Sequence, residues 1–207
     1  MHAHGVTSLK QRVAREAAVL LYTSQEKEYK QAKQRAAQNL GVRVLPSNSE
    51  IAKELDSLAD EIEGSARQER LLQMRREALK IMKALRDFHP KLIGSVWRGT
   101  AHKDSDIDIV TFSSQPTNVL QKLEQEGFEA TKTEWQSAPK LDKKEKSFHI
   151  YLTLPSGNEA EVVVRSLERI NQKVKCEIYG DTVTGLNHRQ LERLLEQNPL
   201  QKFTPYP

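Results

Sequence analysis

Helix-forming residues and a helical spacing of hydrophobic positions run through the first 88 residues of the chain. Residues 8–39 are rich in Ala, Gln, Lys, Glu and Leu, and the glycine at Gly41 predicts the end of this helical stretch. Ser47 and Glu50 have the spacing of a capping box, which predicts the start of a second helix. A third helix is predicted over 66–88, with one face made by Leu71, Met74, Ala78, Ile81, Leu85 and Phe88.

From residue 89 the pattern changes to short hydrophobic runs separated by turns and helices. Strands are predicted at 105–112, 129–135, 148–154, 160–164 and 175–178, and helices at 118–125 and 187–196. This order predicts an α+β fold, in which helices flank a mixed sheet. The tail 198–207 holds three prolines and is expected to be irregular or to dock as an extended strap.

The chain is expected to divide after the second helix. The third predicted helix leads directly into the first strand-turn segment, so we assign residues 66–207 to one domain and residues 1–65 to an N-terminal helical appendage. The appendage could bind an acceptor or a second copy, or it could be extra packing around a small fold.

Two aspartates separated by one apolar residue lie on the first predicted strand. Because side chains alternate along a strand, Asp106 and Asp108 are expected to share one face while Ile107 and Ile109 share the other. Two close carboxylates disfavour joint ionisation, and Mg²⁺ is a hard cation that neutralises such a pair. Alternation alone also fits a half-buried strand with its polar side chains outward.

The segment before the aspartates offers groups that suit a phosphate. Gly94 permits a sharp turn, and Ser95 supplies a hydroxyl and an amide. Arg98 and Lys103 bring positive charge to the same region. Together with the aspartates, these residues outline a phosphoryl-transfer site.

The motif formed by Gly94-Ser95, Arg98-Gly99-Thr100 and Ser105–Val110 resembles the signature of the DNA polymerase β-like nucleotidyltransferase superfamily. The resemblance covers about residues 89–165. It implies that Asp106 and Asp108 are catalytic and bind two Mg²⁺ ions, which Mn²⁺ can replace. It further implies that an NTP is held by Gly94, Ser95, Arg98, Thr100, Lys103 and Ser105.

The same resemblance calls for a third carboxylate on a neighbouring strand. Glu161 directly opens a β-branched run, as the third acid does in this superfamily, so it is the favoured third catalytic and metal-binding residue. Glu159 is the alternative, because strand alternation places both glutamates on one face. Many relatives carry Asp at this position.

Composition adds a weak indication of the partner. The net charge of +4 favours a polyanion such as RNA, although charges of both signs are interleaved. The denser basic segments are 140–146 and a possible stripe at Arg67, Arg70, Arg75, Arg76, Lys80, Lys83 and Arg86. No apolar run reaches the ~20 residues of a membrane span, so no membrane partner and a cytoplasmic location are expected.

Three functions are compatible with these observations. The first is transfer of a nucleoside monophosphate from an NTP to a hydroxyl, with RNA or another nucleic acid as acceptor. The second is transfer to a protein or a small molecule, as in the minimal nucleotidyltransferases of toxin-antitoxin pairs. The third is a catalytically weak module that binds nucleotides or RNA. The sequence leaves the choice of NTP and the oligomeric state open.

Overall fold

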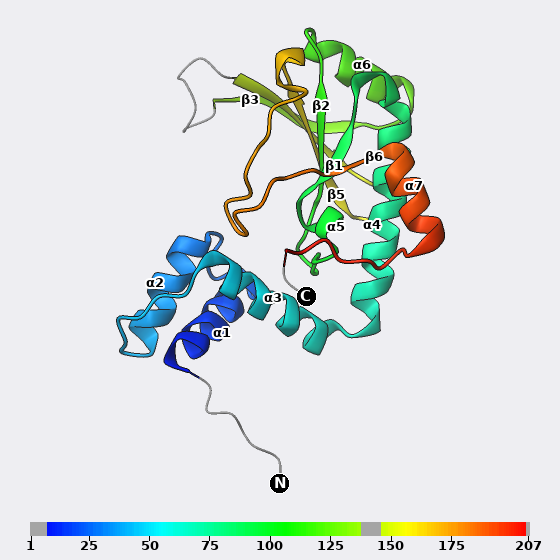
Figure 1. Cartoon of the computed structure of the whole chain (residues 1–207). Coiled ribbons are helices and arrows are strands. Elements are labelled where there is room, and N and C mark those ends of the chain that lie inside the picture. Colours follow the sequence, from blue (N-terminus) through cyan, green and yellow to red (C-terminus); the bar gives the residue numbers. More distant parts are fainter. Residues whose placement is uncertain (1–7, 138–145, 206–207) are drawn as a thin grey trace. The chain divides into compact units, whose positions relative to one another are not determined.

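The computed structural model describes residues 8–137 and 146–205, and its chain folds into two compact units (Figure 1). The first unit contains the chain up to Arg67 with two short loops, His102–Asp104 and Cys176–Asp181, and the second contains Gln68–Ala101, Ser105–Lys175 and the chain from Thr182. The expected boundary at residue 65 stays a prediction. Within the described ranges, no helix is both long and apolar enough to cross a membrane.

The first unit is built on three helices, α1 (Leu9–Tyr22), α2 (Tyr29–Asn39) and α3 (Asn48–Glu63). The prediction of one uninterrupted helical stretch over 8–39 was therefore wrong. The Thr23 hydroxyl bonds to the carbonyl of Val19 at 2.8 Å, and Ser24 has a φ of 56°, which turns the backbone out of the helix.

Small side chains bring the helices of the first unit together. Alanines and a few larger apolar residues form its core, which contains Val13, Ala14, Ala17, Leu20, Ala32, Ala36, Ala37 and Ile51. The capping box at Ser47 and Glu50 is confirmed, since the Ser47 hydroxyl accepts from the Glu50 amide and the Glu50 carboxylate accepts from the Ser47 amide.

The predicted helix over 66–88 is confirmed as α4 (Ser65–Ala84), which is followed by the 3-10 turn η1 (Arg86–Phe88). The idea of one exposed basic stripe on this helix was wrong for two members. Arg67 is 4% exposed and pairs with Asp56 at 2.6 Å and Asp60 at 2.5 Å. Arg75 is fully buried and bonds to backbone carbonyls. Both arginines act within the fold and are not available to RNA.

The second unit contains a six-stranded sheet in the order β3-β4-β5-β2-β1-β6. Its strands are β1 (Lys91–Ile93), β2 (Ile107–Phe112), β3 (Ala130–Ser137), β4 (Lys146–Thr153), β5 (Glu159–Arg165) and β6 (Leu186–Asn187). Strands β2 and β5 are parallel and the other neighbours are antiparallel, so the predicted mixed sheet and α+β class are confirmed.

Helices cover one face of this sheet. Apolar residues of α4, α6 (Pro116–Gln125) and α7 (His188–Gln197) share one core with the strands (Figure 1). The isoleucines of β2, Ile107 and Ile109, are fully buried in that core. By alternation, Asp108 lies on the opposite face of the sheet, away from α4.

The segment after β5 contains a tight turn over residues 176–181. The strand predicted over 175–178 was wrong: Lys175 forms an isolated bridge with Thr182, and the Gly180 amide bonds to the Cys176 carbonyl at 2.8 Å. These groups are used within a tight turn, so no ladder can form. The basic run 140–145 lies outside the described residues, while Lys146 begins β4.

The chain after α7 docks as an extended strap. The Phe203 amide donates to the Arg98 carbonyl at 2.9 Å, and the Phe203 ring stacks on Trp97 with the centroids 6.4 Å apart. Trp97 is only 4% exposed, so it packs inside the fold and cannot stack on a nucleotide base.

Candidate active site

Three carboxylates meet at the ends of β2 and β5. Asp108 of β2 pairs in register with Glu161 of the parallel strand β5, and Asp106 immediately precedes β2. One oxygen from each of Asp106, Asp108 and Glu161 lies within 4.8 Å of the others. Glu159 pairs with Thr153 instead and lies outside this group. The structure thus places Glu161, rather than Glu159, beside the aspartates.

The local electrostatics favour a cation at this group. Burial, followed by the charges of Asp106 and Glu161, raises the pKa of Asp108 to about 8. Ionisation of all three carboxylates at neutral pH is therefore unfavourable unless a positive charge balances them. Hard carboxylate oxygens at this spacing fit a divalent cation such as Mg²⁺ or Mn²⁺.

The Gly94 turn packs directly against Asp108. Gly94 begins the short helix α5 (Gly94–Arg98) with a φ of 69°, a conformation that residues with side chains rarely adopt. A Cβ atom on Gly94 would lie 1.8 Å from Oδ2 of Asp108. Glycine at this position is thus required both by the backbone and by the close approach of the carboxylate.

Three further residues predicted to bind the nucleotide, Ser95, Thr100 and Ser105, are half-buried near α5 and β2. Ser95 and Thr100 are half-buried around α5, with the Thr100 amide bonded to the Ser95 carbonyl at 3.0 Å. Ser105 lies just before Asp106. The structure thus keeps these three residues in the segment that joins the Gly94 turn to the aspartates.

Arg98 and Lys103 have partners of their own. Arg98 is 4% exposed, donates to the Phe203 carbonyl at 2.9 Å, and places its guanidinium 4.5 Å from the centre of the Trp97 ring. Lys103 belongs to a loop grouped with the helical unit, where its amide bonds to Glu63 at 3.0 Å. Nucleotide binding by these two residues stays a prediction, which the packing of Arg98 does not support.

Two side chains of β4 lie next to the third carboxylate. Tyr151 pairs across strands with Glu161, and His149 Nδ1 lies 2.7 Å from Glu161 Oε1. Burial and the neighbouring carboxylates of Glu161 and Glu134 raise the pKa of the Tyr151 hydroxyl. Neither residue was predicted to belong to the site, because their approach to Glu161 depends on the pairing of β4 with β5.

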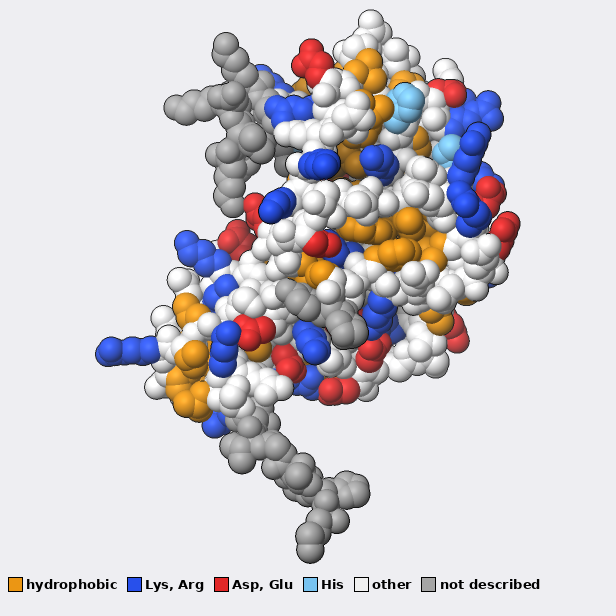
Figure 2. Space-filling view, in the orientation of Figure 1, with side chains coloured by type: hydrophobic (Ala, Val, Ile, Leu, Met, Phe, Trp, Pro, Cys, Tyr) orange, Lys and Arg blue, Asp and Glu red, His pale blue; other side chains and the backbone are white. Residues whose placement is uncertain are grey.

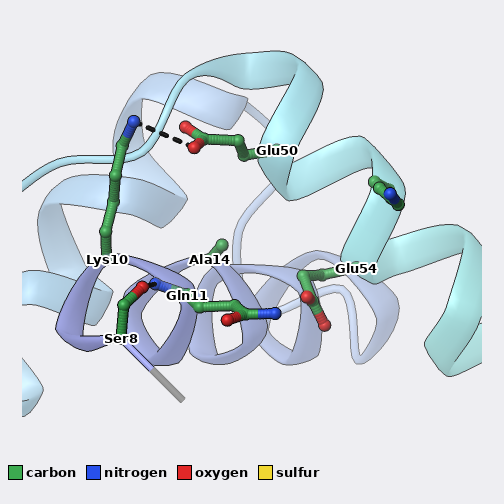
Figure 3. Close-up of a pocket in the computed structure, with 7 residues that line it drawn as sticks. Ser8, Lys10, Gln11, Ala14, Glu50 and Glu54 are labelled. Atoms are coloured by element: carbon green, nitrogen blue, oxygen red, sulfur yellow. Dashed lines mark hydrogen bonds and ion pairs between the residues drawn. The ribbon is translucent and has the colours of Figure 1, made fainter. Parts of the chain in front are cut away.

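The helical unit also contains a concave site. A pocket of about 220 Å³ lies between α1 and α3, and Figure 3 shows side chains of both helices around it. Lys10 pairs with Glu50 at 2.9 Å across this pocket, and Glu54 lies 3.8 Å from Arg15. Because these charges largely neutralise one another, the carboxylate group of the second unit is the stronger candidate for chemistry.

The match to known proteins agrees with this site. A family model described as a nucleotidyltransferase domain matches residues 75–178, half of the chain, and the chain belongs to this family. Its fold is that of the polymerase β-like nucleotidyltransferases, so the predicted relationship is confirmed. No curated protein matches the chain.

Solved structures of RNA-modifying enzymes are among the matches. One is a cytoplasmic RNA terminal U-transferase, with 18% identity and a TM-score of 0.34 over 59% of this chain and 35% of that chain. Another is the Cid1 poly(U) polymerase bound to MgATP, with 19% identity and a TM-score of 0.34 over 57% of this chain and 39% of that chain. The chain spans little more than a third of the length of these structures, and the likeness concerns the fold alone.

Asp108→Asn is expected to stabilise the metal-free protein above pH 8. A carboxyl whose folded-state pKa lies above its ordinary value binds its proton more tightly in the folded state, so stability falls as pH rises from about 4 to about 8. Asparagine removes that loss, and we expect a gain of at least ~1 kcal/mol, roughly 2–4 °C in melting temperature. Thermal unfolding at pH 5 and pH 8.5 with EDTA measures it.

Magnesium provides the control for this prediction. Adding Mg²⁺ should stabilise the wild type more than the variant, because the ion binds the folded state through the carboxylate that asparagine lacks. A variant that melts below the wild type at pH 8.5 in EDTA contradicts the excess of negative charge at the site.

Proposed function

We propose that this protein is a metal-dependent nucleotidyltransferase that transfers a nucleoside monophosphate from an NTP to an acceptor hydroxyl, with RNA as the acceptor. The observation that carries the proposal is the convergence of Asp106, Asp108 and Glu161 in a nucleotidyltransferase domain. The net charge of +4 and the resemblance of the Gly94–Val110 motif to that of nucleotide-adding enzymes favour RNA.

The reaction requires one bond to form and one to break. The acceptor oxygen attacks the α-phosphorus of the NTP, and the bond from that phosphorus to the oxygen bridging to the β-phosphate breaks, so that pyrophosphate leaves. Divalent metal, when bound, supplies positive charge to the phosphates and makes the acceptor hydroxyl more acidic. Asp106, Asp108 and Glu161 would hold it, and a carboxylate of this group is in place to receive the hydroxyl proton.

The Gly94 turn would position the triphosphate. Its backbone approaches Asp108 without an intervening side chain, so phosphate oxygens can reach the turn and the carboxylates together. Ser95, Thr100 and Ser105 would add hydroxyl donors along the same segment. A few residues of one short segment would thus contribute to binding both the nucleotide and the metal.

Charge alone does not single out a surface for RNA. Basic and acidic side chains are interspersed on the face of the molecule in Figure 2, and two of the seven basic residues of 67–86 are buried. The acceptor must therefore be identified by experiment.

The test is incubation of the purified protein with each α-³²P-labelled NTP, Mg²⁺ or Mn²⁺ and total cellular RNA. Label that enters RNA, with one NTP preferred, supports the proposal and names the donor. Label on protein or on a small molecule overturns RNA as acceptor but keeps nucleotidyl transfer. An absence of label, with NTP binding still measurable by calorimetry, supports a binding module instead.

Gly94→Ala is expected to lower the transfer rate roughly 100-fold while the protein stays folded. The new methyl group collides with Oδ2 of Asp108, and the carboxylate must swing away from its partners. The strained backbone costs ~1–2 kcal/mol of stability. Steady-state kinetics at increasing Mn²⁺, together with a melting curve, measure both effects.

Gly157→Ala is the matched control. Gly157 has a φ of 87°, but no atom lies within 4 Å of its added Cβ, so the variant has a comparable backbone strain without a collision at the site. Equal losses of activity in both variants would show that Gly94 acts through stability and not through Asp108.

A further inference from the structure

The carboxylate of Glu161 is hydrogen-bonded by a residue that is not one of the three candidate metal ligands. Oε1 of Glu161 lies 2.7 Å from Nδ1 of His149, and Nε2 of the same ring lies 2.7 Å from the Ser147 hydroxyl. Ser147 and His149 are on β4, and Glu161 is on β5. The three residues form a chain of hydrogen bonds across two strands of one sheet.

The direction of the first bond follows from its chemistry. A carboxylate oxygen only accepts hydrogen bonds, so Nδ1 of His149 is the donor. The Ser147 hydroxyl can donate to Nε2 or accept from it, and it therefore holds the imidazole in either protonation state. His149 is 8% exposed, so the ring has little freedom to turn away.

Glutamate needs such support more than aspartate does. Its longer side chain has an additional rotatable bond, and orienting it costs conformational entropy. The bond from His149 to Oε1 restricts how the Glu161 carboxylate can turn and occupies a lone pair on only one of its two oxygens. Residues that hold a metal ligand in this way typically contribute 10–100-fold to metal affinity or activity.

We propose that His149 is a positioning residue that orients Glu161 toward the cation shared with Asp106 and Asp108. The proposal rests on the proposed function for its catalytic consequence, although its binding consequence can be measured alone. It gives Ser147 a supporting part, since the hydroxyl orients the imidazole.

The test compares two replacements of the same ring. His149→Phe keeps the volume but removes the donor, and His149→Asn keeps an amide N–H close to the place of Nδ1. Mn²⁺ binding to the full chain, followed by electron paramagnetic resonance, should weaken 10–100-fold in the Phe variant and by less than about fivefold in the Asn variant. In the transfer assay, excess Mn²⁺ should restore much of the rate of the Phe variant.

Several results would overturn the proposal. They are wild-type Mn²⁺ affinity in the Phe variant, an equal loss in the Phe and Asn variants, or no Mn²⁺ binding by the wild type. If the Phe variant does not fold, Ser147→Ala replaces it, with an expected loss of roughly 3–10-fold, and an unchanged affinity there counts against the proposal. A wild type that binds Mn²⁺ but transfers no nucleotide refutes the proposed function and leaves the comparison of His149 variants valid.

Discussion

Replacing either Asp106 or Asp108 with alanine is expected to lower nucleotidyl transfer by roughly a thousandfold or more while the protein remains folded. Each replacement removes one of the three carboxylates whose oxygens lie within 4.8 Å of one another. A catalytic group that acts as a unit loses most of its effect when one member is removed. The measurement is single-turnover transfer of labelled nucleotide, with circular dichroism to verify the fold.

Asp104→Ala is the matched control for the two aspartates. Asp104 is an exposed aspartate two positions from Asp106, and its carboxylate bonds to the Ser24 hydroxyl at 3.2 Å. We expect its variant to retain the wild-type rate. Unchanged transfer in either the Asp106 or the Asp108 variant refutes a catalytic role for that residue. Loss of folding in both indicates a structural role for the pair.

The pair of aspartates, Asp106 and Asp108, could be predicted from the sequence because the residues around it lie in one short segment. The Gly94 turn and the alternation of Asp106 with Ile107 are local features, and such features can be predicted from neighbouring residues without knowledge of the fold. The isoleucines indeed face the core, and the turn indeed meets Asp108. The same locality made the capping box at Ser47 predictable.

Residues that act through strand pairing could not be found in this way. His149 reaches Glu161 only because β4 lies beside β5 in a particular register, and that register is a property of the whole sheet. Strand alternation could not separate Glu159 from Glu161 for the same reason. Both glutamates share a face of β5, and only the register that pairs Glu161 with Asp108 distinguishes them.

The burial of Arg67 and Arg75 was also not predicted. Helical spacing places Arg75 beside Leu71, Ala78 and Leu79 on α4, but an arginine is rarely fully buried, so its residue type favoured an exposed position. Its partners are carbonyl groups more than 20 residues away in sequence, which composition cannot reveal. The tail was open to two interpretations for the same reason, because the groups that hold it lie on α4 and α5.

Arg75→Met is therefore expected to destabilise the protein by ~3–5 kcal/mol. The Arg75 guanidinium is fully buried and donates to four backbone carbonyls, those of Val96, Trp97, Pro199 and Gln201, at 2.5–3.1 Å. Burial lowers its pKa only to about 10, so the side chain stays charged at neutral pH. Methionine fills much of the volume but leaves these carbonyls without a donor. Urea unfolding followed by circular dichroism gives the free energy of unfolding.

The Arg75 replacement should also lower activity, because Arg75 joins α5 to the C-terminal strap. Two of its carbonyl partners are in α5, which begins at Gly94 beside Asp108, and the other two are in the strap that follows α7. Arg76→Met is the matched control: Arg76 is the next residue of α4 and is exposed, so its variant should stay within ~0.5 kcal/mol of the wild type. Equal stability of the two variants would mean that water or a rearranged strap satisfies the carbonyls. A large loss for Arg75 alone shows that one buried guanidinium joins α4, the turn before the aspartates and the C-terminal strap.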